Sequence, residues 1–252
     1  MTDRDFTLID LLGRHRVFTI DQITGLLFSS TRSARNRITR LLDLDLIDRW
    51  RTAQRPGSQA FRHTLGYTGA YLYSAARGLP VPRRVAFQHQ QAELVASANL
   101  SHRLAVNDFF ARLTQATKDR PDLALHEWLS ESEAGALTGG LVRPDAAATI
   151  TGADDPVEFW FEHDRGTETL HRVVEKVGRY RTRLPSLHRA LVFELTSEAR
   201  EDHLHAALAG TEPHFTVATA TADRTTDPTK AIWRILHRPG LRRLDRLTDP
   251  TS

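Results

Sequence analysis

The 252-residue chain contains no cysteine. This absence excludes a disulfide-stapled fold, a zinc site built from thiolates and a cysteine nucleophile. Long hydrophobic runs are also missing, because no apolar stretch approaches the roughly 18 residues that a membrane-spanning helix needs. The first five residues carry charges of both signs and do not resemble a signal peptide. We therefore expect a soluble, cytoplasmic protein with no membrane partner.

Lysine is nearly absent, since only three of the 34 Lys+Arg residues are lysines. The charges are also unevenly distributed along the chain. Residues 1–90 contain 14 Arg and 7 Asp, with no Lys or Glu, which is a net charge of +7; residues 91–252 therefore carry −4 of the chain's total of +3. A basic first third joined to an acidic remainder predicts two separate tasks, of which the first suits a polyanion such as nucleic acid.

The basic first third shows three helical patterns, over about 6–13, 19–27 and 30–44. In the third pattern, Ala34, Ile38 and Leu41 share one face. The opposite side and its flanks carry polar residues, namely Arg32, Arg35, Asn36, Arg37, Thr39 and Arg40. Arginine suits guanine edges and phosphates, and asparagine suits adenine edges. This set predicts the recognition helix of a helix-turn-helix, although a solvated amphipathic helix remains the alternative.

A hairpin pattern follows this helix. Residues 46–51 and 61–65 alternate as strands do, and residues 54–59 between them are rich in turn formers. Arg51, Arg55 and Arg62 lie near the expected tip, where they would contact the phosphate backbone or the minor groove. Three helices and a two-stranded wing resemble a winged helix-turn-helix domain, which implies double-stranded DNA as the partner.

Two prolines and a glycine between Gly78 and Arg84 mark the best domain boundary. We therefore expect a DNA-binding domain over 1–77, a linker over 78–87, an α/β domain over 88–222 and a carboxy-terminal extension over 223–252. The elements expected after the linker are helices at 88–118, 168–183 and 200–209, and strands at 123–129, 141–150, 157–164, 190–195 and 215–219. This order predicts a mixed sheet, as part of an overall α+β or α/β fold.

Carboxylates on the expected strands suggest a site for a divalent metal ion. Glu162 and Asp164 are two residues apart and so share one face of a strand. Pairing with the preceding strand would bring Asp145 beside Glu162. Clustered carboxylates suit Mg²⁺ or Mn²⁺, and Lys176 on the following helix could stabilise developing charge. The alternative is that residues 164–168 form only a turn, with Arg165 pairing structurally.

The run Pro144-Asp145 followed by Glu162-His163-Asp164 resembles the PD-(D/E)XK nuclease superfamily. One position departs from that pattern, because Asp164 stands where the superfamily has lysine. Either Lys176 substitutes for that lysine from the helix, or the domain is a nuclease relic that only binds.

The chain from about Phe6 to Thr219 is also similar to the replication-relaxation family of actinobacterial plasmids and integrative elements. The most specific part of this likeness runs from Glu162 to Glu168, with Lys176 and Tyr180 after it. The resemblance implies a role in plasmid or mobile-element replication, in DNA relaxation or in conjugative mobilisation. Because relaxases use a tyrosine nucleophile, it also makes Tyr180 a candidate for covalent chemistry.

Two functions are therefore open. In the first, a Mg²⁺- or Mn²⁺-dependent nickase holds its metal with Asp145, Glu162 and Asp164, and its catalytic set also includes Lys176 and Tyr180. In the second, a non-enzymatic winged-helix regulator or replication accessory uses a degenerate nuclease-like domain for contacts within a homodimer or with plasmid replication or transfer proteins. Metal-dependent DNA cleavage would separate the two.

Overall fold

The computed structural model describes residues 1–51, 59–152, 155–184 and 189–248. The chain divides into two compact units, Met1–Ala111 and Arg112–Ser252. The division falls within a long helix, and each unit has its own sheet. No helix in these described ranges is both long and apolar enough to cross a bilayer.

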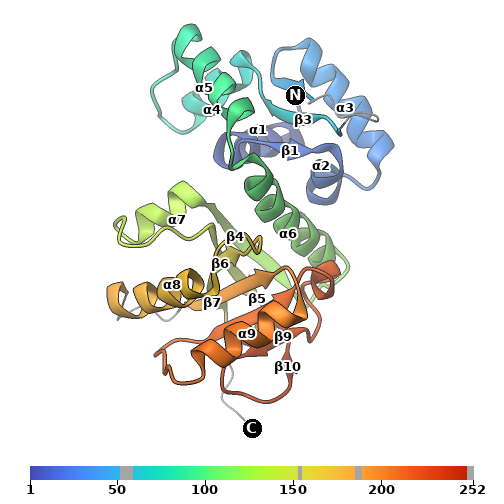
Figure 1. Cartoon of the computed structure of the whole chain (residues 1–252). Coiled ribbons are helices and arrows are strands. Elements are labelled where there is room, and N and C mark those ends of the chain that lie inside the picture. Colours follow the sequence, from blue (N-terminus) through green and yellow to red (C-terminus); the bar gives the residue numbers. More distant parts are fainter. Residues whose placement is uncertain (52–58, 153–154, 185–188, 249–252) are drawn as a thin grey trace. The chain divides into compact units, whose positions relative to one another are not determined.

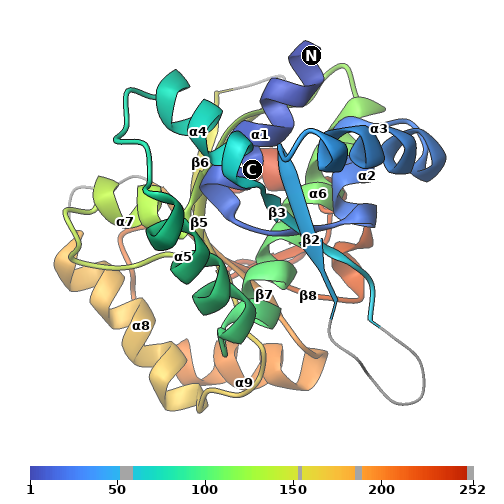
Figure 2. The ribbon, with the colours of Figure 1, turned by 90° about the horizontal axis from the view of Figure 1, so that it is seen from above.

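The first unit is mainly helical. Its elements are α1 (Asp3–His15), β1 (Phe18–Thr19), α2 (Ile20–Leu27), α3 (Thr31–Asp43), β2 (Ile47–Trp50), β3 (Arg62–Leu65), α4 (Tyr67–Ala76), α5 (Arg84–Ala96) and the first part of α6 (Leu100–Lys118). The three strands form an antiparallel sheet in the order β1-β3-β2. Figure 2 shows α2 beside α3, with the β2–β3 strand pair following in the chain.

Helices α2 and α3 begin directly after the capping residues that the sequence indicates, Thr19 and Ser30. The Thr19 hydroxyl accepts a hydrogen bond from the Gln22 N–H at 3.3 Å, and the Gln22 side chain accepts one from the Thr19 N–H at 3.0 Å. This reciprocal pair satisfies two N–H groups that a helix start would otherwise leave unbonded. Ser30 caps α3 by accepting from the Ser33 N–H at 3.3 Å.

The helix expected over 88–118 is in fact two helices. The chain leaves α5 at Ser97, whose hydroxyl accepts a hydrogen bond from the Asn99 N–H at 3.2 Å, and α6 begins at Leu100. The local bond of Ser97 replaces helical bonding at this point.

Residues of α6 before position 112 pack with the first unit. The Asn107 side chain donates to the Val17 carbonyl at 2.7 Å, and the Gln22 side chain donates to the Leu104 carbonyl at 2.8 Å. Buried amides are stable only when they are bonded in this way, so both contacts hold α6 to the amino-terminal helices. The compact units therefore divide after Ala111, whereas the sequence suggested a boundary over 78–87.

The second unit is built on a seven-stranded sheet, which is mixed as the sequence predicted and has two strands more than the five expected. Its elements are the end of α6, β4 (Ala124–Ser130), α7 (Glu131–Leu137), β5 (Ala146–Thr151), β6 (Val157–His163), α8 (Leu170–Arg183), β7 (Ala190–Leu195), α9 (Glu198–Leu208), β8 (Val217–Thr221), the short 3-10 helix η1 (Arg224–Thr226), β9 (Trp233–Ile235), β10 (Leu241–Arg242) and η2 (Leu244–Arg246). The strand order is β10-β9-β8-β7-β6-β5-β4. Strands β6, β7 and β8 run parallel, and the other neighbouring pairs are antiparallel.

Strands β9 (Trp233–Ile235) and β10 (Leu241–Arg242) lie in the segment that the sequence analysis assigned to a carboxy-terminal extension. They extend the same sheet beyond β8. Trp233 on β9 is fully buried, and its indole N–H donates to the Pro228 carbonyl at 2.9 Å. Residues 233–242 are therefore part of the second unit's fold.

Helices α8 and α9 pack together on one face of the sheet (Figure 1). Val173, Val177 and Tyr180 of α8 share a buried cluster with Trp160 of β6 and Phe193 of β7. Because strand side chains alternate, Glu162 lies on the same face as Trp160. His163 and Glu194 project from the opposite face. The fold thus places one acidic side chain, Glu162, directly beneath α8.

Candidate functional site

Helix α3 presents a polar surface made of five exposed residues, Arg32, Arg35, Asn36, Thr39 and Arg40. The Thr39 hydroxyl donates to the Arg35 carbonyl one turn earlier, at 3.0 Å. The other four side chains form no hydrogen bond or ion pair with any residue that the structure describes. No acidic residue lies in the first turn of α3. The surface is therefore basic and free to bind a ligand.

Arg37 on the same helix has a different environment. Its guanidinium is bonded to both carboxylate oxygens of Asp5 on α1, with an Nε–Oδ1 distance of 2.7 Å. Asp5 is buried, and burial acts to raise its pKa, but hydrogen bonds from Arg37 and Thr2 hold that pKa below its ordinary value. Arg37, one of the predicted DNA contacts, therefore joins α3 to α1.

The strand pair after α3 carries the other predicted DNA contacts. Arg51 is exposed, and its guanidinium lies 4.9 Å from the centre of the Phe61 ring. Arg62 is half-buried and donates to the Ala60 carbonyl at 2.6 Å. The third predicted residue, Arg55, lies outside the described residues. Of this predicted set, Arg51 is the residue that the structure places on the surface.

In the second unit, Glu162 is the centre of a buried polar cluster. Its side chain lies at the carboxyl end of β6 and is almost fully buried. One carboxylate oxygen accepts a hydrogen bond from the Lys176 ammonium at 2.8 Å, and the other accepts from the Tyr180 hydroxyl at 2.7 Å. Lys176 and Tyr180 are four residues apart on α8, so both reach the same point on the sheet.

Asp145 lies next to this cluster because of the strand register. Ala146 of β5 pairs with Phe161 of β6, so the next position along the hairpin places Asp145 opposite Glu162. A carboxylate oxygen of Asp145 accepts a hydrogen bond from the His163 N–H at 2.8 Å. The sequence thus correctly predicted that strand pairing brings these two acids together.

Charge and burial shift the pKa values of the cluster. Burial, followed by the neighbouring Asp145, raises the pKa of Glu162 to about 7, although Lys176 and Tyr180 act in the opposite direction. Burial acts to lower the pKa of Lys176, but Glu162 and Asp145 outweigh it and the pKa rises. The ammonium therefore stays charged at neutral pH.

Tyr180 is held as a hydrogen-bond donor. Its side chain is 2% exposed, and burial together with the Glu162 carboxylate raises its pKa well above the ordinary value. A phenol with a raised pKa is a weaker source of phenolate, and a buried phenol is hard for a DNA phosphate to reach. This geometry favours a structural role for Tyr180 over the nucleophilic role that the family resemblance raised.

Asp164 is bonded to the neighbouring helix. Arg200 of α9 donates to both of its carboxylate oxygens, with an Nη2–Oδ1 distance of 3.0 Å. The same Oδ1 accepts from the Gly166 N–H at 3.0 Å, and Gly166 has a φ of +70°, which glycine adopts without strain. The Gly166 N–H bond to Asp164 makes a local turn after β6, and the residue that pairs with Asp164 is Arg200 of α9.

The sequence model described as replication-relaxation matches residues 9–186, well over half of the chain. The chain belongs to the replication-relaxation family. The matched region runs from within α1 to the residues just after α8, so it includes both the α3 surface and the Glu162 cluster. Membership suggests a role in plasmid or mobile-element replication or relaxation, with DNA and replication-related partners in general. Searches of curated proteins and of solved structures found no match.

In this replication-relaxation protein, the donor atoms of the Glu162 cluster decide whether it could hold a metal ion. Both carboxylate oxygens of Glu162 already accept hydrogen bonds, and both oxygens of Asp164 accept from Arg200. Within the described ranges, no group of three or more His, Asp and Glu side chains could hold a metal ion. The residues as arranged do not fit a resident Mg²⁺ or Mn²⁺, and the assignment of Asp145, Glu162 and Asp164 as ligands stays a prediction.

The replication-relaxation protein has a second buried glutamate, which sequence reasoning did not single out. Glu194 of β7 accepts hydrogen bonds from Arg112 at 3.0 Å, from the Thr225 hydroxyl and, at 2.9 Å, from a ring nitrogen of His163. Burial acts to raise its pKa, but His163 and Arg112 hold that pKa below the ordinary value. The sequence feature that could have identified Glu194 is that it is the single acid in the otherwise apolar strand pattern at 190–195.

Proposed function

We propose that this replication-relaxation family member binds double-stranded DNA through a winged helix-turn-helix formed by its first unit. The observation that carries the proposal is the α3 surface, whose arginines and asparagine are exposed and form no bond with another described residue. Such a surface on the third helix of the unit suits base edges and phosphates in the major groove.

The topology of the first unit supports this proposal. The order α1-β1-α2-α3-β2-β3 ends in an antiparallel strand pair directly after α3, where a wing would lie. Arg51 leaves β2 on the surface and can contact the phosphate backbone. The +7 charge of residues 1–90 adds a sequence-independent attraction for DNA.

For the second unit, we propose a non-enzymatic role. Glu162 pairs with Lys176 of α8, and Asp164 pairs with Arg200 of α9, so these acids serve as contacts between the sheet and the two helices. The protein would then act as a regulator or accessory of plasmid or mobile-element replication, relaxation or mobilisation. A homodimer and contacts with replication or transfer proteins are the partner predictions that accompany this role.

Selection of bound duplexes from a random pool by the full-length protein tests the DNA proposal. Asn36→Ala should reduce discrimination between selected and random duplexes by about 1–3 kcal/mol if Asn36 contacts a base edge. Arg40→Gln should weaken both duplexes and lower the slope of log affinity against log salt by about 1 if it contacts a phosphate. Wild-type affinity and salt dependence in both variants would refute a DNA-reading role for α3.

Metal-dependent nicking is the competing proposal, and one observation favours it. Asp145, Glu162 and Lys176 together contain the residue types of the PD-(D/E)XK pattern, with the lysine supplied by α8. Incubation of supercoiled plasmid with the full-length protein, with Mn²⁺ or with EDTA, tests it. Nicking that needs Mn²⁺ and is lost in Asp145→Asn would establish the enzymatic role. Intact plasmid under both conditions, with DNA binding retained, would support the accessory role.

A further inference from the structure

Helix α8 carries five lysine and arginine residues, and four of them lie along one side. Arg172, Lys176, Arg179 and Arg183 are separated by four, three and four positions. At 100° per residue these spacings place all four within an arc of about 60°. We refer to these four residues as the α8 stripe. Arg181, the fifth lysine or arginine residue, falls on the opposite side of the helix.

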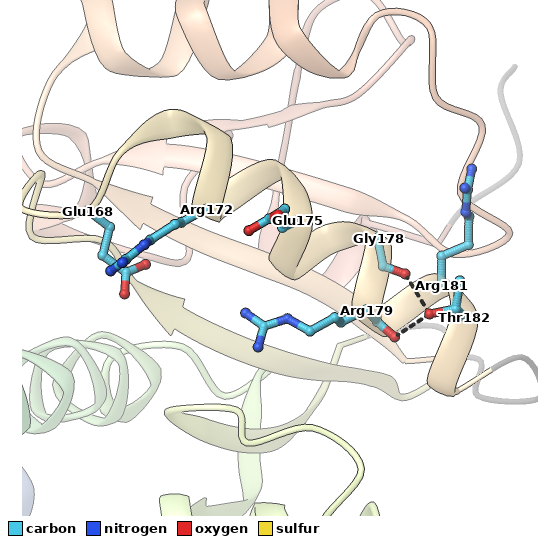
Figure 3. A pocket seen from close by; sticks show the side chains of 7 residues that line it. All are labelled: Glu168, Arg172, Glu175, Gly178, Arg179, Arg181 and Thr182. Carbon is cyan, nitrogen blue, oxygen red and sulfur yellow. Dashed lines mark hydrogen bonds between the residues drawn. The ribbon is translucent and has the colours of Figure 1, made fainter.

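The arginines of the α8 stripe are available for a ligand. Arg172, Arg179 and Arg183 are exposed, and none of them forms an ion pair or side-chain hydrogen bond with a residue in the described ranges. Figure 3 shows Arg172 and Arg179 extending from one side of α8 and Arg181 extending from the other. Elsewhere in this unit, Arg112, Arg200 and Arg224 each pair with a buried acid. The stripe therefore differs from the structural arginines of the same unit.

Acidic residues near the stripe do not neutralise its arginines. Glu168 and Glu175 line an open hollow of about 660 Å³ along the outer side of α8, together with Arg172, Arg179 and Arg181. Glu175 lies 3.3 Å from a ring nitrogen of His171, and Glu162 pairs with Lys176. Three guanidinium groups therefore face solvent within a part of the chain, residues 91–252, that is acidic as a whole.

The dimensions of the stripe suit an extended anion. Arg172 and Arg183 are eleven positions apart, which corresponds to about 16 Å along a helix. Guanidinium groups bind phosphate oxygens through paired N–H donors, and a row of them fits successive phosphates better than a single small anion. Lys176, at the centre of the row, contacts Glu162 directly, so a strand on the stripe would pass beside the Glu162 cluster.

We propose that the α8 stripe binds the phosphate backbone of DNA, as a second contact surface in addition to α3. The proposal takes its partner from the proposed DNA-binding function, and it adds a surface in the acidic unit that the basic amino-terminal region does not account for. The stripe contributes affinity and orientation without reading sequence, because phosphates carry no base information.

The test is a salt titration of duplex binding by the full-length protein. The triple variant Arg172→Gln/Arg179→Gln/Arg183→Gln should reduce the magnitude of the slope of log affinity against log salt by about 3, since each lost phosphate contact reduces it by about 0.9. Arg181→Gln removes one charge from the other side of the same helix, so it is the matched control for the single variant Arg179→Gln, which should reduce the slope by about 0.9. Arg181→Gln should leave the slope unchanged. The triple Arg→Lys variant keeps the charge and should keep most of the slope.

The α3 variant Arg35→Gln/Arg40→Gln, measured in parallel, separates this proposal from the proposed function. Loss of slope in the α8 triple variant supports the stripe, whether or not α3 contributes. A wild-type slope in the α8 variant, together with a reduced slope in the α3 variant, overturns the stripe and leaves the proposed function standing. A loss in Arg181→Gln equal to that in Arg179→Gln would also overturn it, because the effect would then reflect net charge alone.

Discussion

Two buried glutamates on neighbouring strands should respond to pH in opposite directions. Glu162 and Glu194 are each about 1% exposed, but they lie on opposite faces of the sheet. Burial and the adjacent Asp145 raise the pKa of Glu162, whereas His163 and Arg112 hold the pKa of Glu194 below its ordinary value despite burial. Replacing either residue with Gln removes one titrating group and keeps a side chain of similar size.

The magnitude for Glu162 follows from its pKa. The change from 4.5 to about 7 corresponds to about 3 kcal/mol, at 1.36 kcal/mol for each pH unit. Between these two pH values the folded state retains a proton that the unfolded state has lost. The free energy of unfolding of the wild type should therefore fall by about 3 kcal/mol, relative to Glu162→Gln, as the pH rises from 4.5 to above 7.

Glu194 should show the opposite sign. Its folded-state pKa lies below the unfolded value of 4.5, so the unfolded state binds the proton first as the pH falls. The contribution of the Glu194 carboxylate to stability is present above pH 4.5 and is lost as the pH falls through the folded-state pKa. The wild type should therefore gain stability, relative to Glu194→Gln, as the pH rises through the acidic range.

The assay is urea unfolding followed by tryptophan fluorescence at a series of pH values from 3.5 to 8. Replacing Trp50 with Phe leaves Trp128, Trp160 and Trp233, all in the second unit, as reporters. The difference between the wild type and each Gln variant isolates the titrating carboxyl, and any pH-independent offset reports packing and lost hydrogen bonds. A pH-independent difference for Glu162→Gln, or the same sign for both variants, would refute the electrostatic reasoning.

Two further predictions concern backbone space and a buried histidine. Gly69→Ala should destabilise the protein by about 1–3 kcal/mol, because the added Cβ would clash with the Leu46 backbone oxygen. Gly178→Ala should stabilise it by up to about 1 kcal/mol, because Gly178 lies inside α8 with open space around it. Thermal unfolding of the two variants compares these effects. Burial lowers the pKa of His63 to about 4, so the free energy of unfolding should fall as the pH drops from about 6.5 to 4. His63→Gln should remove that pH dependence in unfolding measurements. An unchanged pH profile in the variant would contradict this assignment to His63.

The sequence by itself determined the features that depend on local periodicity. The spacing of Ala34, Ile38 and Leu41 defines the buried face of α3, so the exposed face, with Asn36 and Arg40, follows from helix geometry. The alternation of β5 and β6, joined as neighbouring strands, is enough to place Asp145 beside Glu162. These features need only contacts between residues close in the chain.

The tertiary structure decided the partners of each charged group. Asp164 pairs with Arg200, 36 positions away, and Arg37 pairs with Asp5, 32 positions away. Periodicity identifies the face that a side chain occupies, but it does not identify the residue that another element presents to that face. The same limit applies to the pKa of Glu162, because burial beneath α8 is its largest cause and burial results from packing of the whole unit.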